Sequence, residues 1–105
     1  MESNVIYETI KQTINNYLPD ARILLFGSHA RGDNDSQSDY DLLIITPNLM
    51  AKEERQIESR TLHRALVKGV HAPFDLLFFS EDEIKQKKEL PGHIIGTAIR
   101  EGIIL

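Results

Sequence analysis

Two aspartates at the start of a long apolar run place the strongest constraint on how this chain folds. Asp39 and Asp41 flank a single tyrosine and lead into Leu-Leu-Ile-Ile, and alternate side chains of an extended strand point to the same face. The two carboxylates are therefore expected to lie close together, where like charges repel unless a cation lies between them. A divalent metal is the usual cation in such a position.

A turn of small residues ends the apolar run that precedes this pair. Gly27 and Ser28 follow Leu-Leu-Phe, and glycine permits a tight turn and a close approach of the backbone to another group. Backbone N–H groups in such a turn suit a phosphate, and Ser28 adds a hydroxyl donor. A Gly-Ser pair alone indicates only a loop, but beside a metal site it is typical of nucleotide chemistry.

Hydrophobic spacing predicts helices alternating with short buried strands. The expected helices cover residues 5–18, 51–68, the segment after a capping box at Ser80–Glu83, and 91–101; the expected strands cover 21–26, 40–46 and 74–79, with a small edge strand at 103–105. Residues 27–38 are expected to form a loop with room for one helical turn. Lys68-Gly69 and Gly102 are the expected ends of two of the helices.

The polar groups at the strand ends constrain the topology. If the glycine turn, the aspartate pair and Asp75 meet at one site, strand 21–26 runs antiparallel to the other two. Strands 40–46 and 74–79 are then parallel and are joined by helix 51–68 in a right-handed crossover. The predicted fold is α+β, a small mixed sheet with helices packed on it, in one domain covering residues 1–105.

Asp75 is the third candidate carboxylate. It lies inside the apolar run Phe-Asp-Leu-Leu-Phe-Phe, where an unpaired carboxylate is costly to bury. It is interpreted as facing Asp39 and Asp41, where it binds a metal, accepts a proton from an attacking hydroxyl, or does both. The alternative for all three residues is an exposed aspartate at the end or edge of a strand, which is common in proteins.

Two further polar residues flank the candidate site. Arg31 is placed to contact phosphate oxygens in a bidentate manner, or else pairs with Asp33 or Asp35. Ser38 is placed to position Asp39 or touch a nucleotide, with a local serine turn as an equal alternative.

The remaining histidines and arginines give weaker signals. The histidines are too scattered for a metal site, and the basic face of helix 51–68 is interpreted as a solvated face. These residues are His29, His63, His71 and His93, and Arg55, Arg60 and Arg64.

Composition excludes several classes of protein. The net charge of −4 argues against a broad nucleic-acid-binding face, and the absence of cysteine excludes disulfides and thiolate chemistry. We expect no signal peptide, because the N-terminus has no basic region and no long apolar core, and no membrane span, because no stretch approaches about 18 apolar residues. A cytoplasmic protein is the resulting expectation.

The combined pattern resembles a known superfamily. Gly27-Ser28, the Asp39-Tyr40-Asp41-Leu42 segment and Phe74-Asp75-Leu76 resemble the DNA polymerase beta-like nucleotidyltransferases, and their finer form resembles the minimal nucleotidyltransferase branch. The resemblance implies a palm-type fold in which Asp39 and Asp41 bind two Mg²⁺ ions, as Asp75 also can, and hold ATP. It also implies that Gly27 and Ser28 cradle the phosphates and that Asp75 activates the acceptor hydroxyl.

The resemblance also implies a partner. Minimal nucleotidyltransferases of this type are typically paired with HEPN-domain toxins, and some transfer AMP to a toxin tyrosine and so act as antitoxins. Two alternatives stay open at this point. One is a module that neutralises a toxin by binding without catalysis, and the other is an enzyme that modifies a small molecule or a nucleic acid, which the acidic balance disfavours.

Overall fold

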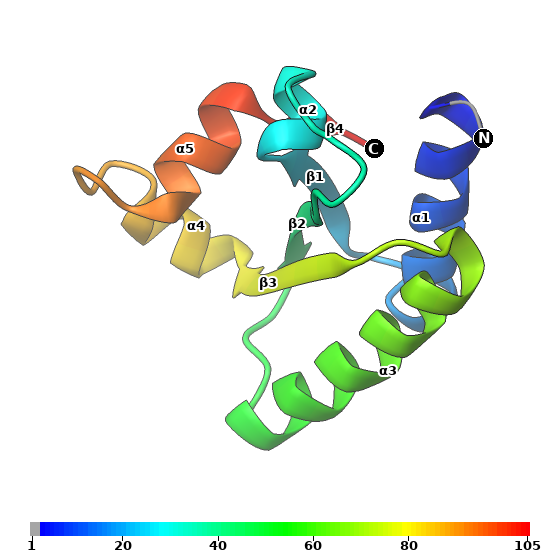
Figure 1. The fold of residues 1–105 in the computed structure, drawn as a ribbon. Helices are drawn as coiled ribbons and strands as arrows, with labels where there is room; N and C mark the ends of the chain where they lie inside the picture. Colours follow the sequence, from blue (N-terminus) through cyan, green and yellow to red (C-terminus); the bar gives the residue numbers. More distant parts are fainter. Residues whose placement is uncertain (1–2) are drawn as a thin grey trace.

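The architecture is a four-stranded mixed sheet with helices on both faces (Figure 1). A computed structural model describes residues 3–105. In chain order the elements are α1 (Ser3–Tyr17), β1 (Arg22–Phe26), α2 (Ser28–Arg31), β2 (Tyr40–Thr46), α3 (Lys52–Val70), β3 (Phe74–Ser80), α4 (Glu81–Lys87), α5 (Ile94–Glu101) and β4 (Ile103–Ile104). The predicted fold class is confirmed.

The strand order is β3-β2-β1-β4. β1 pairs antiparallel with β2 and with β4, whereas β2 and β3 are parallel and α3 connects them. The predicted directions of the three longer strands are therefore correct, and the small edge strand expected at 103–105 is present as β4. The same pairing places Asp41 directly opposite Asp75.

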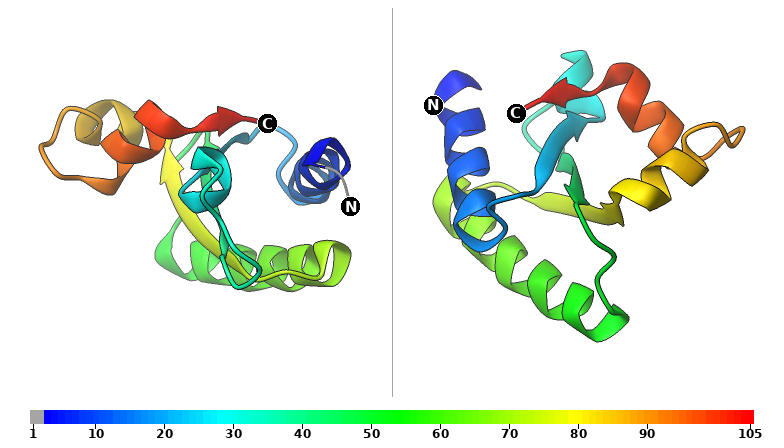
Figure 2. Two further views of the ribbon diagram at one scale, coloured as in Figure 1. Left: turned by 45° about the horizontal axis from the view of Figure 1, so that its top comes forward. Right: turned by 180° about the vertical axis from the view of Figure 1, so that it is seen from behind.

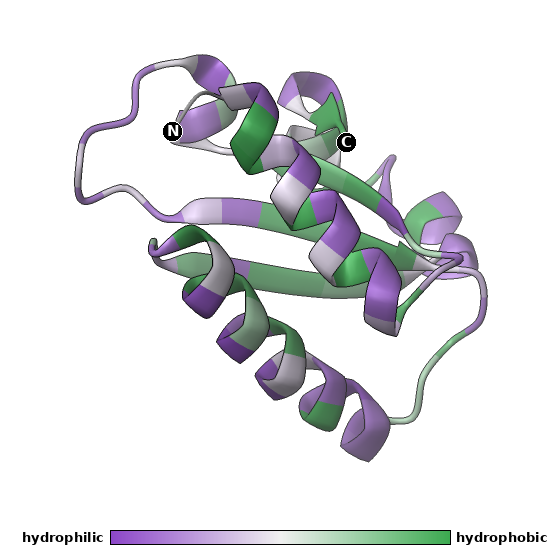
Figure 3. Cartoon of the chain, turned by 90° about the vertical axis from the view of Figure 1, so that its right-hand side faces the viewer, coloured by the Kyte–Doolittle hydropathy of each residue, from purple (hydrophilic) through white to green (hydrophobic). Residues whose placement is uncertain are grey.

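Side chains of the strands alternate between two hydrophobic cores. Leu42 and Ile44 of β2 pack with α1 and α3, whereas Leu43 and Ile45 pack with α4 and α5. Figure 2 shows the α4–α5 pair set apart from α1 and α3 across the sheet. In Figure 3 the strands are mainly hydrophobic, while α1 and α3 carry both kinds of residue, which is typical of helices with one buried face. Asp41 belongs by alternation to the α5 side.

Predicted helix ends differ from the structure by up to three residues, and two of these differences have a clear physical cause. Lys68-Gly69 does not end α3, which continues to Val70 because that side chain is buried in the core. His71 then adopts the left-handed conformation with φ 60°, and its N–H donates to the Val67 carbonyl. The last helix begins at Ile94 rather than at residue 91, because the His93 side chain caps it by accepting from the Ile95 N–H.

The predicted capping box at the start of α4 is confirmed. The Ser80 hydroxyl accepts from the Glu83 N–H, and the Glu83 carboxylate accepts from the Ser80 N–H. These two bonds satisfy backbone donors that the helix itself leaves free.

Among residues 3–105, the structure contains no helix that is long and apolar enough to cross a membrane.

Truncation of one core residue of α3 is expected to destabilise the protein strongly. Leu66 is fully buried, so Leu66→Ala leaves a cavity and is expected to lower the free energy of unfolding by about 2–5 kcal/mol. The matched control on the same helix is Ile57→Ala, where the side chain is 58% exposed and a change within about 0.5 kcal/mol is expected. Urea denaturation measures both, and equal losses for the two variants would contradict this account of the core.

Candidate active site

The aspartates of β2 and β3 meet at the edge of one cleft. Asp41 and Asp75 are register partners across the parallel strands, and both line a cleft of about 450 Å³. Gly27, Ser28 and Arg31 line the same cleft. The structure thus brings together five of the seven predicted site residues.

Asp39 lies at the margin of this site. It is exposed and precedes β2, two residues before Asp41. Its negative charge nevertheless acts on Asp41, where it helps to raise the pKa of the carboxyl.

The electrostatics of the site centre on Asp41. Burial raises the pKa of the Asp41 carboxyl above its ordinary value, and the negative charges of Asp75 and Asp39 raise it further. His29 and Arg31 act in the opposite direction. The carboxylates therefore repel one another in the free protein, and a cation between them would relieve that repulsion.

Gly27 is required at its position for two independent reasons. Its φ of 76° lies in the region that favours glycine. In addition, a Cβ built on Gly27 would overlap the Oδ2 atom of Asp41. The turn and the start of β2 are consequently in direct contact.

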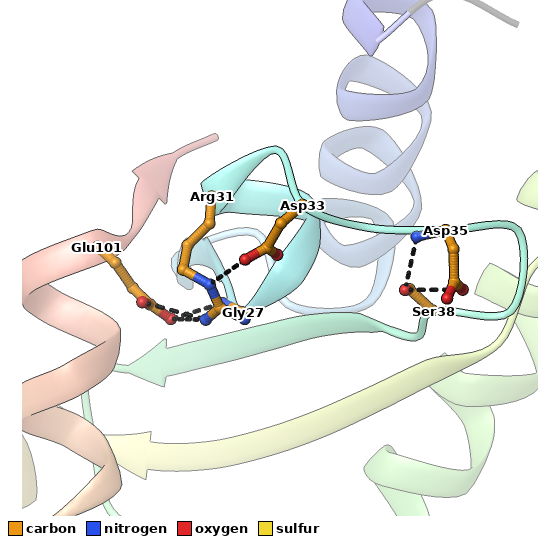
Figure 4. Close-up of polar contacts among 6 residues, drawn as sticks. All are labelled: Gly27, Arg31, Asp33, Asp35, Ser38 and Glu101. Carbon is orange, nitrogen blue, oxygen red and sulfur yellow. Dashed lines mark hydrogen bonds and ion pairs between the residues drawn. The ribbon is translucent and has the colours of Figure 1, made fainter.

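Glu101 is a site residue that the sequence reasoning missed. Its carboxylate accepts a hydrogen bond of 2.8 Å from the Gly27 N–H and also pairs with Arg31, with Nη1–oxygen distances of 3.2 and 3.3 Å. Figure 4 shows this carboxylate reaching from the end of α5 to the turn. A carboxylate thus holds the amide for which a phosphate oxygen was predicted.

Arg31 is paired on both sides. Besides Glu101 it contacts Asp33, with 3.1 Å between Nε and Oδ2. The alternative partner Asp33 is therefore correct, and Asp35 lies elsewhere in the loop (Figure 4). Arg31 still lines the cleft, so its predicted contact with phosphate stays a prediction.

Ser38 forms the local turn that was its alternative interpretation. Its hydroxyl donates to Asp35 Oδ1 at 3.2 Å and accepts from the Asp35 N–H at 3.0 Å. The loop is held further by His29, whose ring stacks on Tyr40 with 3.7 Å between centroids, and Tyr40 in turn stacks on Phe74. His29 was expected only as a surface or loop residue, and this stack fixes the loop over the start of β2.

The carboxylates fit a magnesium ion that arrives with a nucleotide. Within residues 3–105, no group of three or more histidine, cysteine, aspartate or glutamate side chains is arranged to hold a metal ion. Mg²⁺, however, is usually bound by one or two carboxylates together with substrate phosphates and water. Asp39 and Asp41 supply hard oxygen ligands of that number, and the mutual repulsion of the carboxylates favours a cation there.

The chain belongs to the nucleotidyltransferase domain family, which it matches over residues 7–104. It is 41% identical over 58 residues to a protein of Methanocaldococcus jannaschii named "putative protein adenylyltransferase". That alignment covers 53% of this chain and 59% of the relative, so the chain matches it over less than two thirds of its length.

Two solved structures share the fold. One is described as a "putative minimal nucleotidyltransferase", with 20% identity, a TM-score of 0.68, and coverage of 100% of this chain and 97% of the other. The second is a toxin–antitoxin with AMP-PNP, with 17% identity, a TM-score of 0.67, and coverage of 92% and 69%. The predicted nucleotidyltransferase family is confirmed, and the chain is a nucleotidyltransferase domain with the fold of the minimal nucleotidyltransferase structure.

Neutralising Asp41 is expected to stabilise the metal-free protein. Because the Asp41 pKa is raised on folding, the folded state binds that proton more tightly than the unfolded chain does, and stability falls as the pH rises through the raised pKa. Asp41→Asn removes this ionisation. We expect a higher free energy of unfolding than wild type at neutral pH in EDTA, and no such gain well below the ordinary aspartate pKa.

The control for this experiment is Asp20→Asn, because Asp20 is exposed and lies outside the cleft. Chemical denaturation across the pH range measures both variants. Unchanged or lower stability of Asp41→Asn at neutral pH would show that Asp41 is not under repulsion.

The two positive-φ glycines that flank α2 provide a matched test of the turn. Gly27→Ala suffers both the strained φ and the overlap with Asp41, whereas a Cβ at Gly32 (φ 83°) meets nothing within 4 Å. Gly32→Ala is expected to cost about 1–2 kcal/mol, and Gly27→Ala distinctly more. Adding Asp41→Ala should recover part of the Gly27→Ala loss in urea denaturation, and strict additivity would contradict the contact.

Proposed function

We propose that this domain is a Mg²⁺-dependent nucleotidyltransferase that transfers AMP from ATP to a hydroxyl of a partner protein. The single observation that carries the proposal is the register of Asp41 and Asp75, which share one cleft with the Gly27 turn. Carboxylates beside a turn that can approach a phosphate form the donor set that nucleotide transfer needs.

The nature of the acceptor is proposed from the relatives. The Methanocaldococcus jannaschii relative is named for protein adenylylation, and two proteins of the same fold belong to toxin–antitoxin pairs, one of them with AMP-PNP. We therefore propose a toxin of the HEPN type as the partner, a tyrosine hydroxyl as the acceptor, and an antitoxin role in the cytoplasm.

Each residue has a distinct role in this proposal. Asp39 and Asp41 hold Mg²⁺, which neutralises the triphosphate when bound, and Asp75 completes the set of carboxylates. Gly27 and Ser28 approach the phosphates through the turn. Glu101 leaves the Gly27 N–H when a phosphate oxygen takes its place.

The reaction then follows from positioning. Asp75 accepts the proton of the acceptor hydroxyl, and the acceptor oxygen forms a bond to the α-phosphorus. The bond between the α-phosphorus and the oxygen bridging to the β-phosphate breaks, and pyrophosphate leaves with that electron pair. Arg31, and Ser38 if its turn opens, complete the predicted nucleotide contacts.

Transfer of label from α-labelled ATP to a co-purified HEPN partner tests the proposal. Asp41→Asn is expected to lower the transfer rate by about a hundredfold or more, because loss of metal-assisted charge stabilisation is worth several kcal/mol. EDTA is expected to abolish transfer, and Asp20→Asn is expected to retain it. Absence of transfer by the folded wild-type protein with its partner would refute the enzymatic role.

A double variant of the two aspartates separates catalysis from binding alone. The Gly27 N–H is already occupied by Glu101 in the free protein, and this observation favours a binding module that neutralises its partner without nucleotide transfer. If the double variant Asp39→Ala, Asp41→Ala still neutralises the toxin in a growth assay, stoichiometric binding is the function.

A further inference from the structure

A second, larger cleft lies between α3 and β3. It has a volume of about 800 Å³ and is separate from the nucleotide cleft except at one residue, Asp75, which lines both. Cationic and imidazole side chains from α3 form one wall, and the beginning of β3 forms the other. Its lining includes Arg60, His63, Arg64 and Lys68 of α3 and Asp75 and Leu76 of β3, and we call the cleft the basic groove.

Within residues 3–105, the arginines and the lysine of the basic groove form no ion pair. The structure pairs Arg22 with Glu81, Arg31 with Glu101, and Arg55 with Glu83. No ion pair joins Arg60, Arg64 or Lys68 to a carboxylate in the part of the chain that the structure describes.

This lack of pairing is not a shortage of carboxylates, since the chain has 16 acidic residues against 12 lysines and arginines. Positive charge is therefore left available along this groove of an acidic protein. Arg60 and Arg64 are exposed, as expected for a solvated face, and the structure adds that they also line a groove.

The spacing of the cations suits an extended chain. Arg60, Arg64 and Lys68 are four residues apart, so they lie along one side of α3 over about 12 Å. Three to four residues of an extended polypeptide span about that length. β3 is an edge strand, so its outer side, next to the groove, has no strand neighbour in the described sheet.

We propose that the basic groove holds the acceptor polypeptide, and that the segment bound there is acidic, with Asp or Glu flanking the acceptor hydroxyl. The inference rests on the proposed function, and it assigns the acceptor class. A hydroxyl carried by a segment in the groove arrives at Asp75 from the side opposite the turn that faces the nucleotide. Because Asp75 lines both clefts, its carboxylate is available to take the proton of that hydroxyl while the oxygen attacks the α-phosphorus.

A polypeptide fits the groove better than a nucleic acid does. The chain as a whole carries a charge of −4, which repels a long polyanion outside the groove. The phenyl ring of the groove, Phe74, is only 6% exposed and is stacked on Tyr40. It therefore offers no open face to a base, and the exposed imidazole of His63 is a single ring, whereas single-stranded nucleic acids are usually held by stacking successive bases on several aromatic rings.

The test uses two fluorescein-labelled peptides with one central tyrosine. One has glutamate on both sides of the tyrosine, and the other has glutamine at the same positions. Fluorescence anisotropy at low salt is expected to give about tenfold tighter binding of the glutamate peptide, and added salt should weaken it. Equal binding of the two peptides would overturn the inference.

Variants locate the binding to the groove. Arg60→Ala with Arg64→Ala is expected to weaken binding of the glutamate peptide about tenfold, while Lys11→Ala with Lys52→Ala, which removes two exposed cations outside the groove, leaves it unchanged. A charge reversal, Arg60→Glu with Arg64→Glu, should instead favour a lysine-flanked peptide. The assignment would be overturned if the Lys11 and Lys52 variant lost binding of the glutamate peptide. It would also be overturned if both arginine variants bound that peptide as tightly as wild type.

Two further measurements separate the possible failures. Titration of ATP with Mg²⁺ is expected to give the same affinity in wild type and in the Arg60 and Arg64 variants, because the nucleotide binds elsewhere. If wild type binds no ATP, the proposed function fails; if ATP binds but the peptides are not distinguished, only the groove assignment fails. A single-stranded RNA of equal charge serves as a comparison. If it binds more tightly than the glutamate peptide and its binding depends on Arg60 and Arg64, the ligand of the groove is RNA and the polypeptide assignment is overturned.

Discussion

The parallel, in-register pairing of β2 with β3 is the constraint on which the site depends. It sets Asp41 directly opposite Asp75, although a parallel pair requires a long crossover, which α3 provides. The repulsion between the two carboxylates is tolerated because large apolar side chains of the same strands fill both cores. The hydrophobic packing of the strands thus holds like charges together at one end of the sheet. The free energy of this packing offsets the repulsion at the charged site.

The strand directions could be predicted because the chemistry required them. The glycine turn follows the end of one strand, whereas Asp39 and Asp75 lie at the starts of two others. Only one set of strand directions brings these three ends together. The helix that ends at Val70 could not be bounded so well, because Gly69 looks like a stop signal and the burial of Val70 overrides it. Local signals of this kind are weaker than packing.

The charged contacts were the least predictable part of the site. Glu101 lies 74 residues from Gly27, and a glutamate near the end of a helix gives no local signal of a distant partner. The same holds for Arg60 and Arg64, since a basic helix face in solvent and one that lines a groove have the same spacing. In both cases the role of the charged side chain depends on which groups the tertiary fold places opposite it.

The bond between Gly27 and Glu101 also has a consequence for the order of folding. The turn belongs to an early part of the chain, but its backbone donor is satisfied only by a residue at the end of α5. During synthesis β1 emerges long before α5, so the Gly27 N–H has no Glu101 carboxylate to bond to until α5 is made. Contacts of such large sequence separation form late in folding. The turn for which we propose contact with phosphates is therefore complete only when α5 docks, and a nascent chain that lacks α5 has the strands of the site without this hydrogen bond to the turn.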